Sequence, residues 1–186
     1  MVRLVATPAL DFAPETIGDV AIAPAREGRV TSLAPFRGRG DAIAAALDAI
    51  GLGWPGPDRR STAGAASIHW AGRGRALLFR EDVPDFGDDA AVIDMTGAEA
   101  VLTLDGPAAR DVLARLIPVD LSRRAYRVDA TARTLIGHMT GTVIRVADDV
   151  YELRVMRSMG GTLLHDVRRA ARLVHARPLA GKTAAR

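Results

Sequence analysis

The four histidines are the residues best suited to acid–base or metal chemistry: His69, His138, His165 and His175. They show neither an HExxH pattern nor the paired spacing of metal ligands, and the chain has no cysteine to complete a site. His69 lies in an apolar run beside Trp70, which favours a half-buried strand residue over a catalytic base. We therefore expect no metal site and no histidine-based catalysis.

Other catalytic residue patterns are equally scarce. The absence of cysteine excludes disulfides, thiolate nucleophiles, zinc fingers and iron–sulfur clusters. No GxSxG sequence is present to expose a serine nucleophile. Asp148-Asp149 is most simply a hairpin turn, and its spacing alone gives no support for a carboxylate pair in acid–base catalysis. We predict no catalytic, cofactor-binding or metal-binding residue in this chain.

Two glycine-containing segments could bind an anion through backbone N–H groups. Gly38-Arg39-Gly40 lies between a predicted strand and a predicted helix, but Ile43 stands at the third glycine position of GxGxxG, which favours a plain connection. Ser158-Met159-Gly160-Gly161 precedes the last predicted helix and could either seat an anion or cap the helix.

The polar side of that last helix is basic. A solvated face is the simplest interpretation, and a contact with a subunit or an anion is the alternative, since arginine is the cation favoured in protein interfaces. The residues of this face are His165, Arg168, Arg169, Arg172 and His175.

Periodicity and turn residues predict the elements that position these groups in the first half of the chain. Asp41 is suited to cap a helix and Gly51 to end it. The expected elements are a strand at 30–33, a helix at 42–50 and a hairpin of strands at 67–70 and 76–79, with 52–66 as a loop.

The second half repeats this plan. Gly106-Pro107 is suited to open a helix, and Ser158 to cap the last one. The expected elements are a hairpin of strands at 91–95 and 100–104 around Thr96-Gly97, a helix ended by Pro118, strands at 132–137, 142–146 and 150–155, and a final helix.

The predicted fold class is α+β, with two strand–helix–strand halves whose antiparallel sheets pack on helices. We expect residues 1–27 to be an extended N-terminal arm, residues 28–176 a single α+β domain and residues 177–186 a flexible tail. A length of 186 residues suits one or at most two small domains.

Composition narrows the classes of partner. The sequence pI of about 10.1 reflects arginine more than net charge, because the net charge is only +3 and all but one of the 25 basic residues are arginine. Scattered charges and 4% aromatic residues disfavour nucleic-acid binding. There is no apolar run of about 18 residues, so we expect no membrane span. Asp11, Glu15 and Asp19 interrupt any secretory signal, so we expect a cytoplasmic protein.

Several segments carry a resemblance to a known superfamily. Val101–Leu121, VLTLDGPAARDVLARLIPVDL, resembles the folate-binding aminomethyltransferases, in which a strand ends in a Gly-Pro turn before an Ala-Arg-Asp-x-Leu helix. Ala132–His138, ARTLIGH, and Tyr151–Ser158, YELRVMRS, are most similar to the sarcosine oxidase gamma subunit family. Phe36–Asp41 and Trp70 are further matches.

This resemblance covers roughly residues 28–176 and implies an aminomethyltransferase-like fold with an accessory role. The implied protein is the non-catalytic gamma subunit of a heterotetrameric sarcosine oxidase, an oxidoreductase complex acting on CH–NH donors. That complex converts sarcosine to glycine with hydrogen peroxide and passes a one-carbon unit to tetrahydrofolate.

The resemblance also implies where the cofactors lie. FAD, FMN, NAD, tetrahydrofolate and zinc are expected in the partner subunits, and none in this chain. The implied partners are the alpha, beta and delta subunits, with alpha as the expected direct contact through the N-terminal arm and arginine-rich faces. A free-standing folate-binding protein of the same superfamily remains the alternative.

Overall fold

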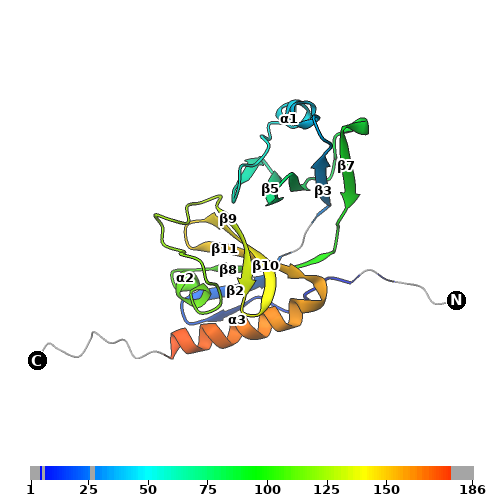
Figure 1. The fold of residues 1–186 in the computed structure, drawn as a ribbon. Helices are drawn as coiled ribbons and strands as arrows, with labels where there is room; N and C mark the ends of the chain where they lie inside the picture. The colour runs from blue at the N-terminus through cyan, green and yellow to red at the C-terminus, as the bar shows by residue number, and fades with distance from the viewer. Residues whose placement is uncertain (1–4, 6, 26–27, 177–186) are drawn as a thin grey trace, which may run out of the picture.

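Two antiparallel sheets make up the computed structural model, which describes residues 5, 7–25 and 28–176 (Figure 1). In the described part of the chain, the large sheet has six strands in the order β1-β2-β8-β11-β10-β9, and the small sheet has five in the order β4-β5-β6-β3-β7. Within each sheet, all the described strand pairings are antiparallel. The predicted α+β fold class is confirmed.

The elements of the large sheet and its helices are β1 (Glu15–Ile17), β2 (Val20–Pro24), β8 (Glu99–Asp105), α2 (Ala109–Leu113), β9 (Thr131–Ile136), β10 (Met139–Ala147), β11 (Val150–Met156), the 3-10 turn η2 (Arg157–Met159) and α3 (Gly160–His175). Those of the small sheet are β3 (Val30–Pro35), α1 (Gly40–Asp48), β4 (Arg60–Ala63), β5 (Ala66–Gly72), β6 (Arg75–Phe79), η1 (Gly87–Asp89) and β7 (Ala90–Asp94).

The core of the large sheet lies between its strands and the two helices α2 and α3, which cover one of its faces (Figure 1). Side chains alternate between the faces of a strand, so Leu102, Val143 and Leu153 point toward these helices. The predicted apolar stripe of the last helix supplies the other half of this core, with Leu163 and Val167 fully buried. Figure 1 shows α3 as the outermost layer of the molecule on this side.

Gly106 occupies the turn that joins β8 to α2, as the Gly-Pro signal predicted. Its φ is +133°, and a Cβ at this position would lie 2.3 Å from the carbonyl oxygen of Asp19. Only glycine permits both that conformation and that approach. The turn between β1 and β2 is thereby packed directly against the start of α2.

A second, smaller core lies between the small sheet and α1. Leu33, Ile68 and Leu78 face Ile43 and Leu47 of the helix. The predicted cap at Asp41 is wrong: the helix begins at Gly40, two residues before the predicted start, Arg39 is the N-cap residue, and no side chain caps it. Asp41 lies in the first turn instead, where its negative charge is favourable to the helix dipole.

The predicted hairpin of strands 91–95 and 100–104 is wrong in its pairing. The turn exists, because the Ala98 N–H donates to the Met95 carbonyl at 3.0 Å. However, β7 pairs with β3 in the small sheet, whereas β8 pairs with β2 and β11 in the large sheet. Turn residues specify that the chain bends, not which strand the next segment will join.

Part of the expected N-terminal arm belongs to the sheet. Within residues 1–27, β1 and β2 form a hairpin, and β2 pairs with β8. Val20 and Ile22 alternate into the core, and this burial fixes the segment. A second omission is β4, which forms within the predicted loop 52–66 by pairing with β5. The expected tail 177–186 lies outside the described residues.

The two sheets are joined where β4 meets β9. The Arg60 N–H donates to the Asp129 carbonyl at 3.0 Å, and the Thr131 N–H donates to the Asp58 carbonyl at 2.9 Å. Asp58 and Asp129 both have positive φ, at 56° and 66°. Aspartate is among the few non-glycine residues that tolerate this conformation, so the junction is a tight pair of turns. Within the described ranges, no helix has both the length and the apolar character to span a membrane.

Candidate functional site

Several charged and polar side chains lie in the space between the facing sides of the two sheets. On β11, Leu153 points toward the helices, so Glu152 and Arg154 point the other way. On the small sheet, Ile68 and Leu78 face α1, so their neighbours in sequence face the large sheet. We call the residues that meet here the inter-sheet charge layer: Arg60, His69, Phe79, Glu99, Glu152 and Arg154.

Arg154 lies at the centre of this layer and is only 5% exposed. Its Nε donates to Glu152 Oε1 at 2.5 Å and its Nη1 donates to Glu99 Oε2 at 3.3 Å. The guanidinium carbon also lies 4.2 Å from the centroid of the Phe79 ring. Burial lowers the pKa of Arg154 to about 9. A buried cation needs such compensation, and here two carboxylates and an aromatic face supply it.

The two acids of the layer are also influenced by burial. Burial raises the pKa of Glu99, against the opposing charge of Arg133. Burial also raises the pKa of Glu152 to about 7; the Arg60 guanidinium opposes this rise and the Glu99 carboxylate adds to it. The ion pair with Arg154 favours the carboxylate form of Glu152, so burial and pairing act on this group in opposite directions.

His69 belongs to the same layer and is 4% exposed. Its Nε2 lies 2.9 Å from Ser67 Oγ, and its ring centroid lies 4.3 Å from that of Phe79. Burial, together with the Arg60 charge, lowers the pKa of His69 to about 3. The residue therefore lies in a strand, as predicted, but it is buried rather than half-buried, and it is neutral at ordinary pH.

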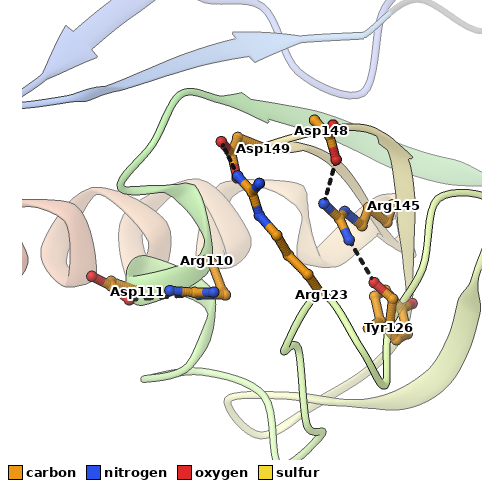
Figure 2. Close-up of polar contacts among 7 residues, drawn as sticks. All are labelled: Arg110, Asp111, Arg123, Tyr126, Arg145, Asp148 and Asp149. Carbon is orange, nitrogen blue, oxygen red and sulfur yellow. Dashed lines mark hydrogen bonds and ion pairs between the residues drawn. The ribbon is translucent and has the colours of Figure 1, made fainter.

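A second polar cluster surrounds Arg145, whose side chain is 2% exposed (Figure 2). Arg145 Nη1 donates to the Tyr126 carbonyl at 2.8 Å, and Nη2 donates to Asp148 Oδ1 at 2.7 Å. The Tyr126 hydroxyl donates to the Val143 carbonyl at 2.6 Å, and burial raises the pKa of this hydroxyl. These bonds hold the loop before β9 against β10.

Asp148 and Asp149 form the turn between β10 and β11, as predicted, and Asp149 has a φ of 57°. Each carboxylate pairs with its own arginine, since Arg123 Nη2 contacts Asp149 Oδ2 at 3.0 Å while Asp148 pairs with Arg145 (Figure 2). The two acids therefore anchor neighbouring elements of the chain.

The two glycine segments take up connecting roles. Arg39 Nε pairs with Asp89 Oδ1 at 3.3 Å, which ties the start of α1 to η1. A Cβ at Gly160 would lie 2.8 Å from that of Ala100, so this glycine lets the first turn of α3 approach β8. The predicted Ser158 cap is wrong, because η2 runs directly into α3, Met159 is the N-cap residue and no side chain caps it.

The remaining histidines lie apart. His138 is in the turn between β9 and β10, and His165 and His175 are on α3. In the ranges that the structure describes, no three His, Cys, Asp or Glu side chains gather as metal ligands would. His165 instead shares a hollow of about 390 Å³ with three arginines of the predicted basic face, Arg168, Arg169 and Arg172.

Sequence reasoning missed the inter-sheet charge layer. Its only signal is the pair Glu152 and Arg154 at alternate positions of a strand whose other residues are apolar. Such a pattern ordinarily marks a solvent-facing side, and the second sheet that covers it comes from residues far away in the sequence.

Comparison with known proteins gives structural matches only. No family model matches the chain, and no curated protein matches its sequence. The fold is similar to a chain of the heterotetrameric sarcosine oxidase from Corynebacterium sp. U-96, with 22% identity and a TM-score of 0.77 over 89% of this chain and 90% of that chain. It is also similar to the glycine cleavage system aminomethyltransferase T from Bartonella henselae, with 16% identity and a TM-score of 0.56.

The two matches differ in extent. The aminomethyltransferase match covers 83% of this chain but 49% of that protein, so this chain corresponds to about half of it. The oxidase chain is matched over almost its whole length. Both likenesses identify the fold as aminomethyltransferase-like.

Proposed function

We propose that this chain is the non-catalytic gamma subunit of a heterotetrameric sarcosine oxidase. The observation that carries the proposal is the fold match to an oxidase chain over almost the full length of both. Two chains matched in this way have similar lengths, so the oxidase chain is a small subunit rather than one with additional domains. The motifs at Ala132–His138 and Tyr151–Ser158 support the gamma family in particular.

In the proposed complex, this chain supplies structure and contact surface. The reaction removes two electrons and two protons from sarcosine and passes them to dioxygen, which leaves as hydrogen peroxide. The methyl carbon goes to tetrahydrofolate, and glycine is released. We assign FAD, FMN, NAD, tetrahydrofolate and zinc to the alpha, beta and delta subunits, with the cytoplasmic location expected from the sequence.

The geometry of the buried charges supports a structural role. Arg154 and Arg145 point into the molecule and pair with neighbouring acids or carbonyls. His69 is neutral and enclosed between the sheets. A catalytic acid or base must reach the substrate, which these enclosed groups do not.

Co-expression with the alpha, beta and delta subunits tests the proposal. We expect this chain to co-elute with them in size-exclusion chromatography, and we expect sarcosine-dependent peroxide production to fall when the chain is omitted. A complex that assembles and turns over equally well without it would contradict the proposal.

The aminomethyltransferase match favours one alternative, a free-standing folate-binding protein. Titration of the isolated chain with tetrahydrofolate separates the two. Saturable binding by a stable monomer that does not join the oxidase subunits would establish the alternative, whereas co-elution without such binding supports the subunit. Fold similarity alone does not decide between them.

A further inference from the structure

The exposed side of α3 presents a row of cations at the surface of the molecule. Positions three and four residues apart lie on one side of a helix, and His165, Arg169 and Arg172 follow this spacing. All three are exposed, while Leu163 and Val167 on the opposite side are buried. Figure 1 shows no element of the described chain beneath this outermost helix.

The row borders the hollow of about 390 Å³ mentioned above, which differs in charge from the other large hollows of the surface. Its lining has three arginines and a histidine but no acidic residue, and the remaining lining residues are Gly161 and Leu173. Each of the four other hollows described in the molecule includes at least one aspartate or glutamate. In the described part of the chain, Arg169 and Arg172 have no ion-pair partner.

The molecule itself shows how a peptide segment binds beside this row. Glu15 of β1 pairs with Arg168 Nε, and the Arg168 guanidinium lies 5.3 Å from the centroid of the Phe12 ring. A segment with one carboxylate and one aromatic ring is therefore already seated on the first arginine. The next two arginines, Arg169 and Arg172, offer the same donors and are exposed, and no described residue forms an ion pair with either.

We propose that this row, His165, Arg169 and Arg172, which we call the α3 basic face, docks an acidic segment of the alpha subunit, a flavin-carrying chain of the proposed complex that we call the flavoprotein subunit. This inference rests on the proposed function, which supplies the partner. Arginine is enriched at protein interfaces, and a planar guanidinium binds carboxylates through paired hydrogen bonds. Leu173 is 49% exposed within the same hollow and provides an apolar contact among the charges. A nucleic acid is less suited to this face, because the row is short and the net charge of the chain is only +3.

Charge reversal in the assembled complex tests the inference. We would compare the wild-type chain with the double variant Arg169→Glu and Arg172→Glu, each co-expressed with the alpha, beta and delta subunits. A matched control is Arg73→Glu with Arg75→Glu, which makes the same charge change at two exposed arginines of the hairpin between β5 and β6. Circular dichroism and thermal melting would show that each variant folds.

The expected result is an affinity for the flavoprotein subunit about tenfold weaker, or weaker still, in the α3 variant alone. Added salt should weaken the wild-type complex more steeply than the variant complex. If the charge-reversed chain does not fold, Arg169→Gln with Arg172→Gln serves instead, and a smaller loss in the same direction is expected.

Each other outcome overturns the inference in a distinct way. If the wild type assembles and the α3 variant assembles equally well, the docking surface is wrong while the proposed function stands. If the wild type itself does not bind the flavoprotein subunit, both are wrong. If Arg169 and Arg172 are instead needed for self-association or for binding a short DNA duplex, the face belongs to a second copy or to nucleic acid.

Discussion

The buried arginines of the sheets and the exposed arginines of α3 differ in what they leave available. Arg154 and Arg145 are surrounded by carboxylates, carbonyls and aromatic rings of the same chain. Arg169 and Arg172 point outward, and no described acid meets them. One residue type therefore serves two purposes here. The buried arginines stabilise the fold, and the exposed arginines are available to bind a partner.

The largest effect is expected from removing the central cation of the inter-sheet charge layer. Arg154→Ala leaves Glu99 and Glu152 between the sheets without their shared partner. The free energy of unfolding, measured by urea denaturation, should fall by about 3–5 kcal/mol. Adding Glu99→Gln and Glu152→Gln to this variant should restore part of the loss. A decrease below about 1 kcal/mol would mean that the layer contributes little.

Tyr126 tests the second buried cluster with a single hydroxyl. Tyr126→Phe leaves the Val143 carbonyl without its 2.6 Å hydrogen bond, and the free energy of unfolding should fall by about 1–3 kcal/mol. Tyr151→Phe is a matched control, because Tyr151 is also buried but its hydroxyl has no hydrogen bond to the described residues. Equal effects of the two substitutions would argue against a specific role for the Tyr126 bond.

His69 predicts a dependence of stability on pH. Its pKa of about 3 in the folded state lies below the 6.5 of an ordinary histidine, so protons bind the unfolded state more readily between these values. The contribution of the buried neutral His69 to the free energy of unfolding is complete above pH 6.5 and is lost as the pH falls. Relative to the His69→Gln variant, the free energy of unfolding of the wild type should fall by about 1.4 kcal/mol per pH unit as the pH is lowered from about 6 to about 4. Parallel pH profiles of the two proteins would contradict the burial of a neutral imidazole.

The smallest effect on stability is expected on α3. Arg169→Gln and Arg172→Gln remove charges that have no partner in the described chain, so the free energy of unfolding should change by less than about 0.5 kcal/mol. Thermal and urea denaturation of the isolated chain would measure this. A substantial loss would place these arginines with the buried set and remove the contrast between the two.

Local signals predicted most elements but not all of their partners. The strands at 132–137 and 150–155 and the apolar stripe of α3 follow from periodicity, because one face of each is buried. The strands β7 and β8 each pair with a strand that is distant in sequence. The turn residues therefore predict the turn between them but not the sheet to which each belongs. The strand β2 is too short to show a clear alternation before its partner β8 is known.

The two groups of charged residues also differ in whether the sequence predicts them. The α3 basic face could be predicted, because helical spacing is a local property of the sequence. The inter-sheet charge layer could not, since Arg154 meets Phe79 only after two separate sheets have come together. No local pattern distinguishes a charge that a second sheet will cover from one that faces water.

The pairing of β2 with β8 has a consequence for the order of folding. The whole small sheet is inserted between these two neighbouring strands. During synthesis the hairpin of β1 and β2 is made first, yet β8 is made only after β7. The strands β3 to β7 are contiguous in sequence and can pair as they emerge. In contrast, Val20 and Ile22 can be buried only after β8 and the later elements of the large-sheet core have been synthesised. The large sheet therefore contains the first described strands, β1 and β2, and can be completed only after all the strands of the small sheet have been synthesised.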